Sequence, residues 1–287
     1  MSLKHYSQTA LKESRLTSEA DLNSIRLLEG NLKTEGENLI FAYAGSFNPP
    51  HRGHIDVLLS ALRCEVGATA VVIVPSEDFF LRNKIRDKNP EFFLSQKRRA
   101  DILNAIPSIP RDRVWVWPST WYPFKSFTKA MARVAEADGF NVRFSWLIGP
   151  DLLNPEDATF VVPYSLQGVL VSNKARHVES HFLPNGMPAV WKGFGQWDRK
   201  TSVETNGRLS NSIVDDEEVV MWRCTSEDEI SGKRGYYLEH KRVVSNDINS
   251  TDLRQSLVQN GILNERVLND QSTEDLMEYL SPILQEK

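Results

Sequence analysis

Short apolar runs alternate along this chain with segments of helical periodicity, and this alternation constrains the fold more than any other feature. Several of the helical segments carry apolar residues three and four positions apart, over residues 55–62, 98–106 and 124–134. Strands that alternate with such helices build parallel sheets. We therefore predict an α/β fold, a Rossmann-like, doubly wound and mainly parallel sheet with helices on both faces. Its strands are expected over residues 39–44, 70–74, 113–117, 142–148, 167–172 and 236–244.

Two regions interrupt this pattern. Residues 1–38 are polar apart from a group of apolar residues between Leu22 and Leu32, which predicts an N-terminal extension with one amphipathic helix on the outside of the domain. Residues 173–235 are dominated by Gly, Asn, Ser and Asp, and their tryptophans follow no helical or strand period. They predict an irregular insertion before the last strand, part of which forms a small sheet or a lid. The main domain is thus expected over 39–287, interrupted by this insertion.

Composition limits the partners and the compartment. The 34 basic and 38 acidic residues give a net charge of −4, so no overall electrostatic attraction to nucleic acid is expected and any anion site must be local. The two cysteines, Cys64 and Cys224, form no CxxC pair, which argues against a disulfide framework or a zinc site. No apolar stretch approaches the length of a membrane span, and the polar start lacks a signal-peptide core. We expect a soluble cytoplasmic protein, with the nucleus as an alternative, that binds neither nucleic acid nor a membrane.

The turn Gly45–His54 lies between the first apolar run and the first helical segment. Backbone amides at the start of this turn and at the start of the helix can face an anion, which the helix dipole favours. Gly45 would let a phosphate approach the backbone, Pro49-Pro50 would stiffen the turn, and His51 and His54, three residues apart, would point the same way. A lone histidine at a helix start is more often a cap or a surface residue. Two histidines between glycines and prolines favour a phosphate site.

A second phosphate element is the stretch Asn246–Arg254, with the sequence NDINSTDLR. Ser250 and Thr251 would open a helix with hydroxyls and free amides turned outward, and Arg254, one turn later, could reach the same anion. Taken alone, the stretch is better explained as an ordinary N-cap followed by a solvated arginine. Together with the first turn, it predicts the second half of a polyphosphate clamp.

These two motifs resemble those of a known superfamily. GSFNPPHRGH is similar to the nucleotidylyltransferase signature G-x-F-x-P-x-H-x-G-H, and NDINSTDLR is similar to its C-terminal S-T-x-x-R element. Within that superfamily the chain most resembles the eukaryotic-type nicotinamide (nicotinic acid) mononucleotide adenylyltransferases, over about 39–172 and 236–287. Further matching stretches are Pro75–Asp78, Arg98, Ser119–Trp121 and Leu147–Leu153.

The resemblance implies a role for each matching residue. His54 would contact the reacting α-phosphate, with His51 assisting and Arg254 completing the catalytic set. Among the mononucleotide-binding residues, Lys84 is preferred to Arg82 for the family's lysine, because Leu81 occupies the simplest alignment. The resemblance implies that ATP contacts the backbone of Gly45, Ser46 and Phe47 and the side chains of Asn246, Ser250 and Thr251. Gly149 and Asp151 would line the ribose and metal region. Trp121 would stack on the pyridine ring. Mg²⁺ would arrive on ATP without a direct protein ligand.

The implied reaction transfers AMP from ATP to nicotinamide or nicotinic acid mononucleotide, forming NAD or deamido-NAD and pyrophosphate. Positioning and charge neutralisation would suffice, since a phosphate monoester is already a nucleophile. Two alternatives stay open: a related cytidylyl- or adenylyltransferase with another phosphorylated acceptor, and a nucleotide-binding or ATP-hydrolysing protein with a regulatory role. Individual residues also have simpler explanations, because Trp121 could be a core tryptophan and Asp151 a helix cap.

Overall fold

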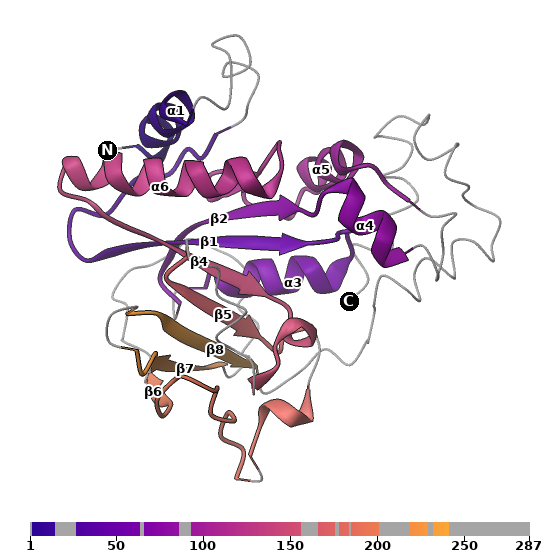
Figure 1. Cartoon of the computed structure of the whole chain (residues 1–287), viewed down its shortest axis with the longest axis vertical. Coiled ribbons are helices and arrows are strands. Elements are labelled where there is room, and N and C mark those ends of the chain that lie inside the picture. The colour runs from indigo at the N-terminus through magenta and orange to yellow at the C-terminus, as the bar shows by residue number, and fades with distance from the viewer. Residues whose placement is uncertain are drawn as a thin grey trace.

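A mainly parallel sheet forms the centre of the molecule, as the cartoon in Figure 1 shows. The computed structural model describes residues 2–14, 27–63, 66–85, 93–155, 166–175, 178–183, 185–200, 219–228 and 232–240. The eight strands follow the order β3-β2-β1-β4-β5-β8-β7-β6, in which the last two are antiparallel to their neighbours. Their bounds are β1 Glu37–Gly45, β2 Ala68–Pro75, β3 Val114–Val116, β4 Asn141–Ile148, β5 Gly168–Ser172, β6 Asp198–Lys200, β7 Val219–Thr225 and β8 Arg234–His240.

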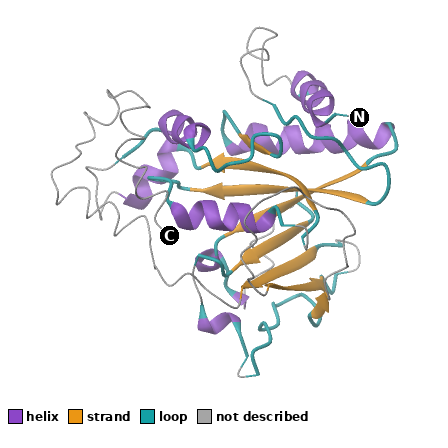
Figure 2. Ribbon diagram, turned by 180° about the vertical axis from the view of Figure 1, so that it is seen from behind, coloured by secondary structure: helices purple, strands orange, loops and turns teal. Residues whose placement is uncertain are grey.

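Helices cover both faces of the sheet, which Figures 1 and 2 show from opposite sides. Side chains alternate along each strand, so Ile40 and Ala42 of β1 join one apolar cluster with helices α1 and α6, while Phe41 and Tyr43 join a second cluster with α3 and α5. Because both faces are covered, β1 is apolar along its centre without polar interruption. The helices are α1 Leu3–Glu13, α3 Arg52–Ala61, α4 Asp78–Ile85, α5 Gln96–Ala105 and α6 Trp121–Ala137, with short 3₁₀ turns η1 Pro150–Leu152 and η3 Glu179–His181.

The predicted α/β architecture is confirmed. Each predicted strand overlaps an observed one, and the three predicted helices correspond to α3, α5 and α6. Ser95 is the N-cap of α5, and its hydroxyl accepts a hydrogen bond from the Arg98 N–H at 3.3 Å. The last predicted strand continued to residue 244, but residues beyond 240 lie outside the described part of the chain. Helix α4 was not predicted, because Asp78–Ile85 shows no clear apolar stripe.

The helix expected near residues 22–32 is wrong for its described portion. Residues 27–32 are extended or irregular, with Asn31 bridged to Ser2, and the N-terminal helix is instead α1. Leu27, Leu28 and Leu32 are buried in the same cluster as α1 and α6. Their spacing resembles that of an amphipathic helix, but they belong to an irregular segment that packs against α1. The N–H of Leu3, the first residue of α1, donates a hydrogen bond to the Gly30 carbonyl at 2.7 Å and so links that segment to the helix.

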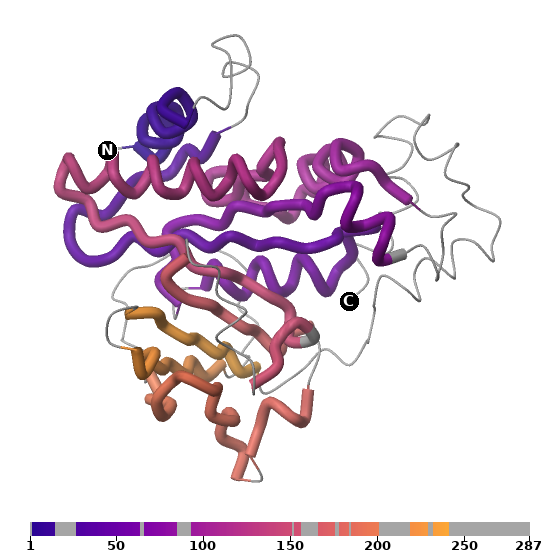
Figure 3. The backbone as a smooth tube through the Cα atoms, viewed as in Figure 1, coloured from indigo at the N-terminus to yellow at the C-terminus, as the bar shows by residue number. Residues whose placement is uncertain are grey.

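The insertion also differs from the expectation. Instead of forming a separate sheet or lid, its described strands β6 and β7 extend the main sheet beyond β8. The trace in Figure 3 is salmon to orange over these strands. Trp191 and Trp197 are buried core residues. A Cβ at Gly235 of β8 would lie 2.7 Å from Trp191 Cζ3, so the glycine makes room for the indole ring. No described helix has both the length and the apolar character needed to span a membrane.

Candidate active site

Those predicted site residues that the structure describes lie at the carboxyl edge of the sheet. The turn Gly45–His54 follows β1, Lys84 lies on the helix after β2, Trp121 opens the helix after β3, and Gly149 follows β4. Carboxyl ends of parallel strands share one edge, which is where open α/β sheets bind ligands. The tertiary structure therefore brings together segments about 100 residues apart in the chain.

The conformation of the turn depends on Phe47. Its φ of 47° lies in the left-handed region that residues with side chains rarely adopt. The ring is fully buried and lies edge-to-face against Tyr43 and His54, with centroid distances of 5.2 and 4.9 Å. A Cβ at Gly45 would lie 3.0 Å from Phe47 Cζ. The Phe47 ring therefore fills the space where a Gly45 Cβ would lie, so the missing side chain makes room for this ring and not, as expected, for a phosphate.

The two histidines form a stacked pair at the start of α3. Their ring centroids are 3.7 Å apart with the planes tilted by 35°, so the two rings lie against each other. The N–H of His51, the N-cap residue, donates a hydrogen bond to His54 Nδ1 at 3.2 Å. A Cβ at Gly53 would lie 3.2 Å from the His51 ring, so this glycine permits the stacking. Because His54 Nδ1 accepts this hydrogen bond, the neutral ring carries its own hydrogen on Nε2.

The surroundings of His54 favour its neutral form. Burial lowers the pKa of His54 well below its ordinary value of 6.5, and repulsion from His51 and Lys84 lowers it further. The imidazole is thus uncharged near neutral pH. It can donate a hydrogen bond from Nε2 to an anion, but it carries no additional proton to give to a leaving group.

Lys84 of α4 is the basic residue that reaches the turn. Its Nζ lies 3.4 Å from Ser46 Oγ, and its side chain is exposed. The competing positions point elsewhere, because Leu81 is buried against Phe93 and the Arg82 guanidinium lies 3.8 Å from the centre of the Phe93 ring. Among these three candidates, Lys84 contacts the turn Gly45–His54 through Ser46.

Trp121 has features both of a core tryptophan and of a residue that could stack on a pyridine ring. It opens α6 after the N-cap residue Thr120 and packs against Phe124 and Trp146, with centroid distances of 5.2 and 4.8 Å. Its side chain is only partly buried, at the edge of the core. A ring held in this way is rigid and retains surface on which a planar group could stack.

The structure describes only some of the remaining residues that are predicted to bind nucleotide. Gly149 is the N-cap of η1, and Asp151 lies within that turn. Asn246, Ser250, Thr251 and Arg254 lie outside the described residues. Across the described ranges, no group of three or more His, Cys, Asp or Glu side chains is arranged to hold a metal ion.

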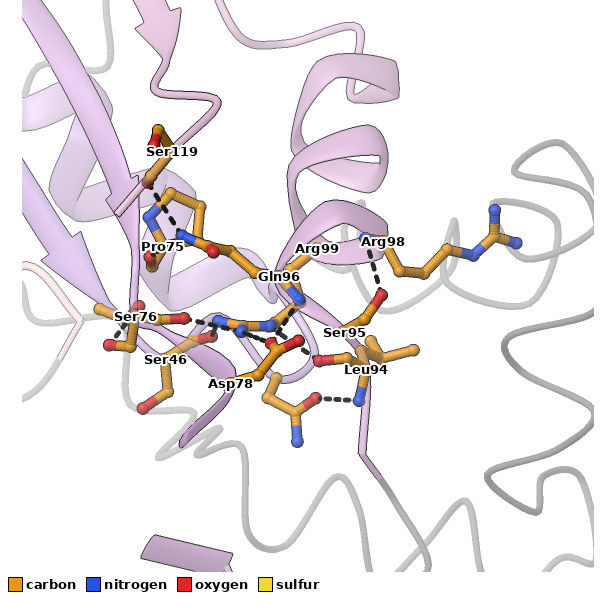
Figure 4. A network of polar contacts seen from close by, with 12 residues as sticks. Ser46, Pro75, Ser76, Asp78, Leu94, Ser95, Gln96, Arg98, Arg99 and Ser119 are labelled. Carbon is orange, nitrogen blue, oxygen red and sulfur yellow. Dashed lines mark hydrogen bonds and ion pairs between the residues drawn. The ribbon is translucent and has the colours of Figure 1, made fainter. Parts of the chain in front are cut away.

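The sequence did not reveal Arg99, the residue that organises the floor of this site (Figure 4). Its side chain is completely buried and donates to the carbonyls of Ser46, Ser76 and Leu94 and to Asp78 Oδ1, at 2.7 to 2.9 Å. Burial lowers the pKa of Arg99, while Asp78 opposes the shift. The family resemblance indicated the neighbouring Arg98 instead. The sequence signal that could have identified Arg99 is its spacing, because it lies three and four positions before the buried Ile102 and Leu103 and so shares their helix face.

Comparison with known protein families settles the broader assignment. The family model described as cytidylyltransferase-like matches residues 42–256. The chain belongs to the cytidylyltransferase-like family. The matched region of this nucleotidyltransferase contains both phosphate motifs, Gly45–His54 and Asn246–Arg254. A search among curated proteins found no match.

Proposed function

We propose that this cytidylyltransferase-like protein transfers AMP from ATP to nicotinamide or nicotinic acid mononucleotide, forming NAD or deamido-NAD and releasing pyrophosphate. One observation carries the proposal: a neutral His54, with its proton on Nε2, lies at the same turn as the ammonium group of Lys84. A neutral donor and a cation at one turn suit two phosphorylated substrates. The family assignment supports nucleotidyl transfer in general.

The chemistry requires no nucleophile from the protein. A phosphate oxygen of the mononucleotide attacks the α-phosphorus of ATP, a new P–O bond forms, and the bond from the α-phosphorus to the bridging oxygen breaks as pyrophosphate leaves. Negative charge accumulates on the α-phosphate oxygens and on the leaving group. The His54 Nε2–H would donate to an α-phosphate oxygen in the transition state, where a preoriented donor has most effect.

The other residues would bind and align the two substrates. Lys84 would pair with the phosphate of the mononucleotide, and Trp121 would stack on its pyridine ring. His51 and the backbone of Gly45, Ser46 and Phe47 would contact ATP. The residues Asn246, Ser250, Thr251 and Arg254 would bind its β- and γ-phosphates, with Gly149 and Asp151 near the ribose.

Mg²⁺ enters this proposal with ATP. When bound, it would neutralise phosphate charge and favour departure of pyrophosphate. Its ligands in the proposal are phosphate oxygens, with Asp151 contacting the ion at most through water.

The decisive measurement is pyrophosphate release by the wild-type protein with ATP or CTP against a panel of phosphorylated acceptors that includes both pyridine mononucleotides. We expect release with ATP and a pyridine mononucleotide, and loss of release in His54→Ala. Release with CTP or with another acceptor would indicate a related transferase. Formation of inorganic phosphate without an acceptor would indicate a hydrolase, and ATP binding without either product would indicate a regulatory nucleotide-binding protein.

A further inference from the structure

The Arg99 guanidinium bonds to four acceptors on three segments of the chain at the floor of the candidate site. Nη1 donates to the Ser46 carbonyl at 2.7 Å, Nη2 to the Ser76 carbonyl and to Asp78 Oδ1 at 2.7 and 2.9 Å, and Nε to the Leu94 carbonyl at 2.9 Å. Only the planar fork of an arginine can satisfy so many acceptors in different directions. A lysine would retain the charge but would not reach all four.

The contact with Ser46 fixes the direction of an amide in the phosphate turn. The Ser46–Phe47 peptide is trans, so the Ser46 carbonyl and the Phe47 N–H lie in its plane and point in opposite directions. Since that carbonyl points to Arg99, the Phe47 N–H points away from α5. The orientation of a donor available to an anion at this turn thus depends on Arg99.

The same guanidinium places the helix that carries Lys84. Asp78 is the first residue of α4, and its Oδ1 accepts from Arg99 and from the Gln96 backbone N–H, the latter at 2.6 Å. The Lys84 side chain, further along this helix, then lies 3.4 Å from Ser46 Oγ. Arg99 therefore holds both partners of the Ser46–Lys84 contact.

Gln96 forms a separate link, toward the segment that carries Trp121. Its Nε2 donates to the carbonyls of Pro75 and Ser119, each at 3.0 Å. Pro75 ends β2, and Ser119 comes two residues before Trp121. Figure 4 shows Gln96 and Arg99 side by side at the start of α5, with their partners on either side.

We propose that the first turn of α5 is the positioning element of the site, in which Arg99 aligns the ATP-phosphate turn and α4, and Gln96 aligns the acceptor-stacking segment. The inference rests on the proposed function for the identity of the two substrates. Neither residue need touch a substrate. A purely structural role would predict lower stability alone, with kcat and both KM values unchanged.

The test separates these effects by measuring kcat and both KM values for Arg99→Lys and Gln96→Met, well below their unfolding temperatures. Arg99→Lys should lower kcat/KM for ATP about 30-fold, because several bonds to a charged group are lost. Gln96→Met should raise KM for the acceptor about tenfold, with KM for ATP almost unchanged. The matched control is Lys97→Gln, whose exposed side chain on the same helix pairs only with Asp101 in the described structure and should leave both values unchanged.

A second readout does not depend on the acceptor. In a ¹⁵N–¹H correlation spectrum, ATP should shift the Phe47 amide resonance of the wild-type protein, and this shift should be lost in Arg99→Lys. If Arg99→Lys does not fold, the split between the two KM values of Gln96→Met decides the question alone.

The outcomes distinguish this inference from the proposed function. Unchanged kinetics in both variants of an active enzyme would overturn the inference and leave the function intact. A wild type without activity toward pyridine mononucleotides, but with an ATP-induced Phe47 shift that Arg99→Lys abolishes, would support the inference and refute the acceptor. Absence of ATP binding by the wild type would overturn both.

Discussion

The backbone N–H of His51 donates to Nδ1 of His54 at 3.2 Å, and this contact leaves the hydrogen of the neutral imidazole on Nε2. The bond joins the N-cap to the third residue of α3, so the start of the helix itself sets the tautomer of the ring. The burial that keeps His54 neutral also strengthens the interaction of its N–H with a developing anion.

Replacing this donor should reduce catalysis much more than stability. We expect His54→Ala to lower kcat about 100- to 1,000-fold, the effect of losing one donor to transition-state charge. The measurement is steady-state pyrophosphate release together with a thermal unfolding curve. His5→Ala, in an exposed residue of α1, serves as the histidine control. Near-normal turnover in a folded His54→Ala protein would refute the role of His54.

The lowered pKa of His54 predicts how stability depends on pH. Since the pKa in the folded state lies below 6.5, the unfolded chain binds this proton more readily. The stability that the neutral His54 contributes to the folded state is therefore complete above pH 6.5, and it is lost as the pH falls from there toward the folded-state pKa of His54. The difference in unfolding free energy between wild type and His54→Gln should change over that interval. A His54 imidazole that titrates at 6.5 by NMR would contradict the prediction.

Gly45→Ala should damage both stability and activity. The new Cβ would lie 3.0 Å from Phe47 Cζ, so the ring that contacts His54 must shift. Overpacking of this kind costs about 1–3 kcal/mol. Denaturant unfolding and kcat should both report the change. At Gly195 a Cβ would meet only the Thr225 carbonyl, at 3.6 Å, so Gly195→Ala is the matched control. Equal behaviour of the two variants would show that the Phe47 ring moves without consequence.

Trp121→Leu should affect the acceptor more than ATP. Loss of a stacking surface is expected to raise KM for the pyridine mononucleotide about tenfold, within the range of aromatic stacking energies. KM for ATP in the same variant is the internal control. The thermal midpoint should fall moderately, because Trp121 also packs on Phe124 and Trp146. A loss of stability with both KM values unchanged would identify it as a core residue only.

Lys84→Gln should weaken binding of the acceptor phosphate and also alter His54. Removing the nearby cation relieves a repulsion that lowers the His54 pKa, so that pKa should rise toward its ordinary value. Acceptor KM and an NMR titration of His54 measure the two effects. Arg82→Gln, on the same helix but with its guanidinium over Phe93, should change neither. If Arg82→Gln raises the acceptor KM and Lys84→Gln does not, the family's lysine position belongs to Arg82.

Errors in the sequence-based prediction occurred where a local pattern had more than one tertiary solution. The leucines between residues 27 and 32 have helical spacing, yet they are buried in an irregular segment beneath α1. Strand β7 was missed because it lies within residues 173–235, whose composition predicts irregular structure. Its position depends on pairing with β8 and on the space that Gly235 leaves beside Trp191.

The sequence by itself determined the strands β1 to β5, the crossover helices and the strand–turn–helix unit at Gly45–His54, because periodicity, caps and turn residues act between near neighbours. Only the tertiary structure decided that Lys84 reaches Ser46, that Arg99 and not Arg98 joins the site, and that Phe47 fills the space at Gly45. The first two depend on contacts across 38 and 53 positions in the chain. The third depends on the left-handed backbone of one buried residue.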